Sequence, residues 1–248
     1  MKMSENQNII ILGMHRSGTS LVAGILFRFG IFMGKNFLGI HASNPFGHFE
    51  DQNVIDLNDQ ILAAAGGSWK DPPGSEAILN QADKFRKEII SLIAAMPSGT
   101  WGWKDPRLSI TIELFLPYLH NPVFIVCQRE PLLIVDSLYR RSQIDRKQGL
   151  RLTDIYQKRI EYVLEKYPDH RRMFVSHKEI CSDPGAVIRQ IITFLRLEIP
   201  PKKYRAARRF VMPKFRVHIA GEIIQKSVST KAALLNILKI IKSVFSQT

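Results

Sequence analysis

One short stretch near the N-terminus constrains the fold more than any other part of the chain. It runs from Asn8 to Gly30 and reads N-I-I-I-L-G-M-H-R-S-G-T-S-L-V-A-G-I-L-F-R-F-G. Residues 9–12 form an apolar run typical of a fully buried strand, and residues 21–29 repeat apolar side chains at helical spacing before Gly30. The stretch therefore predicts a buried strand, a loop and a helix, in that order.

The loop carries the pattern of a phosphate-binding loop with one change. Gly13 and Gly18 enclose four residues, and Thr19 stands where nucleotide triphosphatases have lysine. Backbone N–H groups of such a loop point at an anion, whereas the ammonium that reaches a β- or γ-phosphate is missing. His15 and Arg16 lie inside the loop instead. The pattern indicates an anionic ligand other than ATP or GTP; a turn without a ligand is the alternative.

Length and composition favour a single domain. A chain of 248 residues with 45% hydrophobic residues can bury one sizeable core. Residues 1–100 contain 8 Lys and Arg against 9 Asp and Glu, whereas residues 201–248 contain 11 against 1. We therefore expect an α/β domain over residues 1–200 and a basic, mainly helical extension of that domain over residues 201–248. The charge suits an anionic ligand, an acidic glycan, nucleic acid or a membrane surface.

Other global features suggest a cytoplasmic protein. The two cysteines indicate neither a disulfide framework nor a cysteine-based zinc site, and no run reaches the roughly 18 apolar residues that span a bilayer. The helical pattern of residues 231–245 combines a wide apolar face with lysines. It predicts either a peripheral contact with an anionic membrane or packing against the domain.

The order of the predicted elements defines the fold class. We expect further helices over residues 54–62, 78–95, 109–119, 132–141, 152–167 and 184–195, further strands over residues 101–104, 122–127 and 173–176, and a charged, mobile segment over residues 142–151. Strands that alternate with helices indicate a parallel sheet covered on both faces, with ligands at the carboxyl ends of the strands. The prediction is a three-layer, P-loop-like α/β fold.

Arg129 provides a second anion-binding candidate. It follows the buried strand of residues 122–127, and Ser137 lies eight positions later, so both can face one anion beyond the strand end. The loop residues 16–20, R-S-G-T-S, resemble the first loop of sulfotransferases that use 3′-phosphoadenosine 5′-phosphosulfate (PAPS). The spacing R-x7-S is similar to the 3′-phosphate site of the same family.

A third similarity lies downstream and extends the resemblance over residues 8–197. Residues 174–180, F-V-S-H-K-E-I, and then D-P at 183–184 resemble a strand, a turn and a helix of that family. The late R-K-G element that cytosolic members use on the 3′-phosphate is absent. The candidates to replace it are Arg208, Arg209, Lys214 and Arg216.

The resemblance implies a transferase that moves a sulfuryl group from PAPS to a hydroxyl of a carbohydrate or another small or glycan acceptor. Sulfuryl transfer depends on positioning and charge stabilisation, and the low charge of the group means that no metal is required. Arg16 and Lys104 are the expected charge stabilisers. The nucleotide-binding residues that the resemblance implies are His15, Arg16, Ser17, Gly18, Thr19, Ser20, Arg129 and Ser137.

The acceptor hydroxyl also needs a base. Glu50 is the first candidate because it follows F-G-H-F where a loop enters a helix, and the resemblance to glycan-type sulfotransferases favours Glu. His48 is the second candidate and His15 the third. The alternative is that Glu50 only complements a helix dipole and that the histidines are loop residues.

Two further residues are candidates for acceptor binding. Arg107 follows the strand of residues 101–104 in the run K-D-P-R, where Asp105 can orient it or form a local ion pair with it. Trp69 lies in a loop rich in Gly and Pro and can stack on a sugar or on adenine, or pack beneath the loop.

Two other function classes stay open at this point. A P-loop kinase would share the loop, but Thr19 in place of lysine argues against it. A basic membrane- or nucleic-acid-binding module would use the C-terminal charge, although no RNA-recognition or zinc signature supports it, and we expect no nucleic-acid partner. The pattern of residues 32–74 does not identify the acceptor, and the sequence does not predict an oligomeric state.

Overall fold

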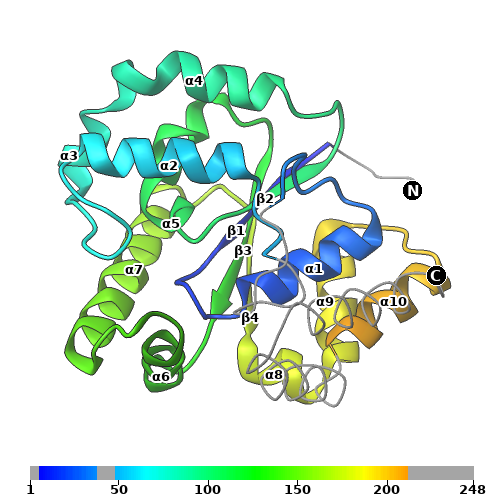
Figure 1. Cartoon of the computed structure of the whole chain (residues 1–248). Helices are drawn as coiled ribbons and strands as arrows, with labels where there is room; N and C mark the ends of the chain where they lie inside the picture. The colour runs from blue at the N-terminus through cyan, green and yellow to red at the C-terminus, as the bar shows by residue number, and fades with distance from the viewer. Residues whose placement is uncertain (1–5, 38–47, 212–248) are drawn as a thin grey trace, which may run out of the picture.

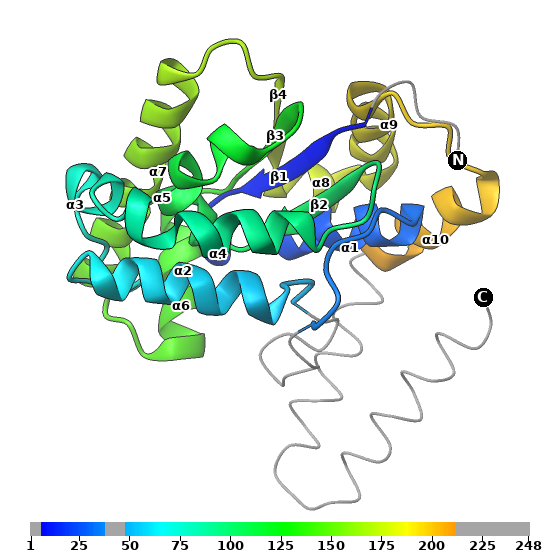
Figure 2. The same cartoon turned by 90° about the horizontal axis from the view of Figure 1, so that it is seen from above.

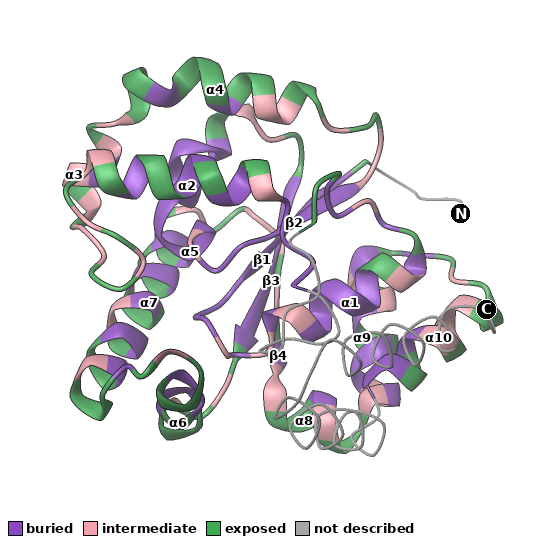
Figure 3. Ribbon diagram, in the orientation of Figure 1, coloured by how far each residue is buried: buried purple, intermediate pink, exposed green. Residues whose placement is uncertain are grey.

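A four-stranded parallel sheet forms the centre of the molecule (Figure 1). The computed structural model describes residues 6–37 and 48–211. The strands stand in the order β2-β1-β3-β4, and their bounds are β1 Asn8–Leu12, β2 Trp101–Lys104, β3 Pro122–Gln128 and β4 Arg172–Ser176. Every residue of β1 and β2 is buried (Figure 3). Because β1 lies between β2 and β3 with both faces covered, its sequence is a continuous apolar run.

Helices cover both faces of the sheet, as Figures 1 and 2 show from two directions. One layer contains α1 Thr19–Phe29, α8 His177–Ser182, α9 Pro184–Leu195 and α10 Pro201–Val211. The other contains α2 Gln52–Ala64, α3 Ser75–Leu79, α4 Ala82–Ala94, α5 Leu108–Thr111, α6 Pro131–Ser142 and α7 Arg146–Lys166. The expected three-layer α/β arrangement is confirmed.

Alternating side chains of the strands divide the core into two parts. Ile9 and Ile11 pack with α1, α9 and α10, whereas Ile10 and Leu12 pack with α2, α4, α5 and α7. All four isoleucine and leucine side chains are fully buried. The period-2 geometry of a strand thus assigns successive residues of one apolar run to opposite helical layers.

Two predicted helices are interrupted in the structure, each for a local reason. The expected helix over residues 78–95 is split after Leu79, since α4 begins only at Ala82 and the weak helix former Asn80 lies between the two helices. The expected helix over residues 109–119 ends as an α-helix at Thr111 and continues as the 3₁₀ turns Ile112–Leu114 and Leu116–Tyr118. Pro117 has no N–H to donate and disrupts a regular helix there.

The charged segment over residues 142–151 is mostly helical, so the expectation of a mobile linker there is wrong. Helix α7 begins at Arg146, because the Asp145 carboxylate accepts a hydrogen bond of 2.9 Å from the Gln148 N–H and caps the helix.

The C-terminal expectations are tested only in part. Helix α10 packs antiparallel to α1, with Phe210 against Gly24 and Lys203 against Gly30. The amphipathic helix expected over residues 231–245 lies outside the described residues, as do Lys214 and Arg216. The membrane contact and the division at residue 200 therefore stay predictions.

The contact between α1 and α10 generates a stability prediction with an unusual sign. Replacing Gly by Ala inside a helix normally stabilises it by up to about 1 kcal/mol. A Cβ at Gly24 would lie 2.2 Å from Phe210 Cε1, so α10 must shift. We expect Gly24→Ala to lower the free energy of unfolding by about 1–3 kcal/mol, measured by denaturant unfolding.

Gly185→Ala in α9 is the matched control, because a Cβ there meets its nearest neighbours at an ordinary 3.4 Å. This variant should be neutral or slightly stabilising. Combining Gly24→Ala with Phe210→Leu should cost less than the sum of the two single changes. Equal unfolding free energies for Gly24→Ala and Gly185→Ala would contradict the proposed steric conflict.

Candidate functional site

The carboxyl ends of the four strands bring the predicted site residues to one edge of the sheet. Because all strand pairs are parallel, the loop after β1, Lys104 at the end of β2 and Arg129 after β3 share that edge. His177 follows β4 at the same edge. This is where ligands bind in open α/β sheets.

Three left-handed residues shape the loop after β1. Gly13, Arg16 and Gly18 have φ angles of 150°, 73° and 104°. A Cβ on Gly13 would lie 2.6 Å from Ser17 Oγ, so only glycine fits that position. The Gly13 N–H donates to the buried Ser109 hydroxyl at 2.9 Å, which fixes the start of the loop.

Helix α1 begins at the end of this loop without a side-chain cap. Gly18 is the N-cap residue, and no acidic residue lies in the first turn. The N–H groups and the positive end of the helix dipole therefore point toward the sheet edge, a favourable place for an anion. A Cβ on Gly18 would lie 3.1 Å from the His177 ring, so glycine also permits the close packing of the start of α8 against this loop.

Unpartnered polar atoms are concentrated at the loop. In residues 6–37 and 48–211, six buried side-chain nitrogen or oxygen atoms lack a hydrogen-bond partner. Three of them belong to this region: His15 Nε2, Ser17 Oγ and Arg129 Nε. A buried polar group without a partner costs about 1–3 kcal/mol, so three such atoms together mark this edge as a candidate site for a polar ligand or ordered water.

The two predicted anion-binding elements are in direct contact. Arg16 Nε donates to Ser137 Oγ at 2.8 Å, and Arg129 Nη1 donates to the Arg16 carbonyl oxygen at 2.8 Å. Burial lowers the pKa of the Arg129 guanidinium. A partly desolvated cation interacts strongly with an anion, so the loop and the residues after β3 form one positive surface.

Lys104 and Glu50 form a buried ion pair at the end of β2. Lys104 Nζ donates to Glu50 Oε1 and, at 3.2 Å, to the His48 carbonyl oxygen. The two side chains are 2% and 8% exposed, so the pair is almost completely removed from solvent. Glu50 directly precedes Asp51, the N-cap of α2, and its carboxylate faces the lysine of the neighbouring segment.

Arg107 is held by two carboxylates. Its Nη1 donates to Asp105 at 2.9 Å, and its Nε donates to Asp59 at 2.6 Å. Burial raises the pKa of Asp105, and Arg107 opposes that shift. Burial disfavours the charge of Arg107, but Asp105 and Asp59 raise its pKa above the ordinary value. The fully buried Asn58 also donates to Asp105, at 2.8 Å, and fixes its orientation.

His15 and Trp69 meet above the loop. Their ring centroids are 4.3 Å apart, and the Tyr156 ring lies 6.1 Å from His15. The Tyr156 hydroxyl donates to the Trp69 carbonyl oxygen at 3.3 Å. Burial lowers the pKa of His15 well below its usual range, and the nearby Arg107 adds to the shift.

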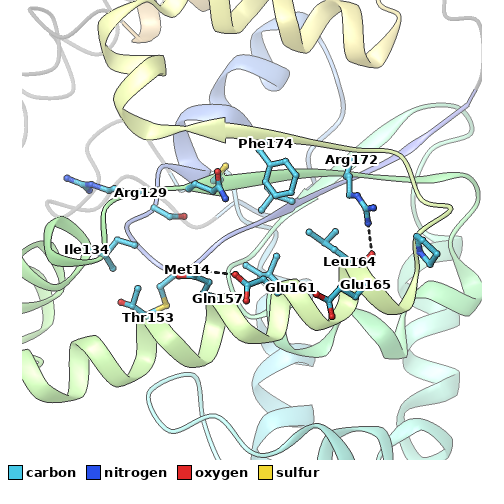
Figure 4. A pocket seen from close by; sticks show the side chains of 16 residues that line it. Met14, Arg129, Ile134, Thr153, Gln157, Glu161, Leu164, Glu165, Arg172 and Phe174 are labelled. Carbon is cyan, nitrogen blue, oxygen red and sulfur yellow. Dashed lines mark hydrogen bonds between the residues drawn. The ribbon is translucent and has the colours of Figure 1, made fainter.

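A cavity of about 680 Å³ lies between α7 and the strands β3 and β4 (Figure 4). Ser17 and Arg129 contribute to its lining at the loop, while Ile134, Leu164 and Phe174 line its apolar part. The cavity therefore adjoins the loop after β1 on the β3 side, whereas Lys104 ends β2 on the other side of β1.

The structure brings most sequence-predicted residues to one edge and adds others. Trp69, Arg107 and the pair His48 and Glu50 come from three different segments: Trp69 contacts His15 of the loop, Glu50 and the His48 carbonyl oxygen contact Lys104 at the end of β2, and Arg107 follows β2. Sequence reasoning missed Asn58, Asp59, Ser109 and Tyr156. Asn58 carries a detectable signal, since it is a polar residue within the predicted apolar helix of residues 54–62, whereas the other three resemble ordinary surface or core residues.

The part of the chain that the structure describes contains neither a candidate metal site nor a candidate membrane-spanning helix. There, no group of three or more His, Cys, Asp or Glu is placed to hold a metal ion. In the same residue ranges, no helix combines the length and apolar character needed to cross a bilayer.

Comparisons with known proteins agree with this geometry. Three solved structures share the fold. The sulfotransferase STF9 from Mycobacterium avium is 17% identical with a TM-score of 0.50, and the match covers 84% of this chain and 68% of that one. The sulfotransferase domain of the Synechococcus PCC 7002 olefin synthase is 16% identical with a TM-score of 0.50 (82% and 77% coverage). The sulfotransferase domain from the curacin biosynthetic pathway is 14% identical with a TM-score of 0.52 (82% and 77%).

The family assignment rests on a sequence model rather than on these distant structures. No curated protein matches the chain significantly. The model described as the sulfotransferase family matches residues 8–201, which include the loop, Glu50, Lys104, Arg129 and Ser137. The chain therefore belongs to the sulfotransferase family.

Proposed function

We propose that this sulfotransferase transfers a sulfuryl group from PAPS to a hydroxyl of a carbohydrate or another small or glycan acceptor. The observation that carries the proposal is the contact of Arg129 with the Arg16 backbone at 2.8 Å. It supports a single nucleotide site in which one end of the ligand lies on the loop and the other on Arg129 and Ser137.

The residues present fit such a nucleotide. Ser17 Oγ and Arg129 Nε are buried without partners, and the uncapped start of α1 adds N–H donors. We assign the phosphosulfate to Arg16, Ser17 and the backbone of residues 18–20, and the 3′-phosphate to Arg129 and Ser137. Arg16 Nε donates to Ser137 Oγ in the structure, and the Ser137 hydroxyl can still donate its own O–H to a phosphate, so this bond can persist when the nucleotide binds.

The acceptor side of the site provides a base and a cation. When bound, PAPS supplies the sulfuryl group, and its other product is adenosine 3′,5′-bisphosphate. Glu50 takes the proton of the acceptor hydroxyl as the new oxygen–sulfur bond forms. Lys104 holds the Glu50 carboxylate in place, and with Arg16 it stabilises negative charge that develops on the oxygen leaving sulfur. His48 contributes its carbonyl oxygen, which positions Lys104.

The acceptor is expected to lie against Trp69 and Arg107. Trp69 is held against His15 and offers an aromatic face, which supports a ring-shaped acceptor. Arg107 is fixed by Asp105 and Asp59, so its remaining N–H groups have a defined direction. A contact of the basic C-terminal segment with a membrane would hold the enzyme at the membrane surface.

The nucleotide assignment predicts a selective thermal shift. Adenosine 3′,5′-bisphosphate should raise Tm by several degrees, since a hundredfold excess over Kd stabilises a protein by about 2.7 kcal/mol. ATP with Mg²⁺ should shift Tm much less, because Thr19 replaces the lysine of nucleotide triphosphatases. A larger shift with ATP and Mg²⁺ would favour a kinase instead.

Two variants should affect nucleotide binding and catalytic turnover separately. Arg129→Ala should weaken binding of adenosine 3′,5′-bisphosphate about 10- to 100-fold, because a charge-assisted hydrogen bond is lost. Glu50→Ala should leave that affinity nearly unchanged and lower kcat by about 10²- to 10⁴-fold. Calorimetry and turnover of an acceptor found in a screen of sugar, lipid and phenolic alcohols provide the two measurements.

Arg86→Ala is the matched control, since it removes an exposed arginine whose ion pair is with Asp83 of the same helix, α4. Its nucleotide affinity should stay close to that of the wild type. If Arg129→Ala and Arg86→Ala bind the nucleotide equally well, the 3′-phosphate assignment is wrong.

The buried ion pair predicts strong coupling between its members. Lys104→Met leaves a buried carboxylate unpaired, and Glu50→Gln leaves a buried ammonium unpaired, so each should cost about 3–5 kcal/mol of unfolding free energy. The double variant removes both charges and should recover most of that loss. Additive losses in denaturant unfolding would mean that the two groups do not depend on each other.

A further inference from the structure

We propose that His15 is a specificity-determining residue that accepts a hydrogen bond from a second hydroxyl of the acceptor, so that the enzyme selects ring-shaped polyols over monohydroxyl alcohols. This inference rests on the proposed sulfuryl transfer to an alcohol. It assigns His15 to the acceptor rather than to the nucleotide.

The position of the imidazole is the first argument. His15 is only 8% exposed, and its ring lies against Trp69 at 4.3 Å and toward the edge of Tyr156 at 6.1 Å. Its Nε2 is buried without a partner in residues 6–37 and 48–211. A neutral imidazole has one donor and one acceptor nitrogen, and leaving them unused is costly. The ring is therefore placed for a ligand that the protein itself does not supply.

The surrounding charges select the kind of ligand. Burial, Arg107, Lys104, Arg141 and Arg16 all lower the pKa of His15, so the ring is neutral near pH 7. A cationic ligand would be repelled by these groups.

An anionic acceptor group is also poorly matched. Lys104 is already paired with Glu50, and Arg107 is already paired with Asp105 and Asp59. Arg16 belongs to the proposed nucleotide loop, where the donor brings its own negative charge. Arg141 is exposed in the last turn of α6, where water and salt screen its charge. A neutral hydroxyl is the partner that remains for a neutral imidazole.

The proton count requires a second hydroxyl. The reacting hydroxyl has one proton, and Glu50 takes it in the proposed mechanism. The acceptor nitrogen of His15 therefore needs the proton of another hydroxyl on the same molecule.

The neighbouring aromatic side chain indicates a ring. The Trp69 backbone is fixed by the Tyr156 hydroxyl at 3.3 Å and by the turn in which Ser68 and Asp71 exchange backbone hydrogen bonds. A rigid indole beside a hydrogen-bonding imidazole suits the apolar face and polar rim of a sugar or cyclic polyol.

A minimal pair of acceptors tests this inference. Wild-type enzyme with PAPS should sulfate trans-cyclohexane-1,2-diol with a kcat/KM about tenfold or more above that for cyclohexanol, since one hydrogen bond to a buried group is at stake. His15→Phe keeps a ring but has no nitrogen, and it should reduce the ratio to about the twofold expected from two equivalent hydroxyls. His15→Gln keeps an acceptor atom and should retain part of the preference.

Affinity for adenosine 3′,5′-bisphosphate should be unchanged in both variants. Tyr167→Phe is the packing control, because it removes the hydrogen bond of the Tyr167 hydroxyl to Glu113, which takes no part in the contacts of His15 and Trp69; it should lower Tm and leave the acceptor ratio intact.

Three outcomes would overturn the inference: an unchanged ratio in His15→Phe, a parallel loss of nucleotide affinity in that variant, or no preference for the diol in the wild type. Failure of the proposed function itself would appear separately, as absence of nucleotide binding by the wild-type protein.

Discussion

The site depends on a loop that three distant segments hold in a left-handed conformation. Gly13 is fixed by Ser109, which lies 96 residues away, and Arg16 is bound through its side chain to Ser137 and through its carbonyl oxygen to Arg129. A backbone with three positive φ angles in six residues is costly unless surrounding contacts determine it. The positions of α5, α6 and the end of β3 are therefore coupled to the shape of the loop after β1.

Pairing of charges explains how so many cations can gather at one buried edge. Lys104 is neutralised by Glu50, and Arg107 by Asp105 and Asp59, so the desolvation cost of these cations is largely offset within the fold. Arg129 differs, because its hydrogen bond goes to a carbonyl oxygen and no carboxylate lies within ion-pair distance among the described residues. Its charge is thus the one that an incoming anion meets with least competition.

The sequence predicts local features of this site well and long-range ones poorly. The strand, loop and helix around Gly13 follow from glycine spacing and apolar periodicity, and the R-x7-S spacing predicts Arg129 at the exit of a strand and Ser137 two turns into the next helix. The pairing of Glu50 with Lys104, 54 positions apart, depends on how α2 packs beside β2. No spacing rule encodes such a contact, because a lone carboxylate before a helix is usually a surface residue. The charged composition of residues 142–151 predicts a mobile segment. In the structure the Asp145 cap is sufficient to begin α7 at Arg146 within that segment.

In the proposed function, the strand order separates nucleotide binding from the reaction with the acceptor. In the order β2-β1-β3-β4, the loop after β1 is flanked on one side by Lys104 and on the other by Arg129. The β3 side offers guanidinium and hydroxyl groups that suit a phosphate, whereas the β2 side offers a carboxylate–ammonium pair that suits an alcohol. A ligand that spans the loop from Arg129 would present its far end to Glu50 and Lys104. Arg129 and Lys104 follow different strands, so the proposed donor end and the proposed base can change independently, whereas His15 shares the loop after β1 with Arg16 and Ser17 and links the two.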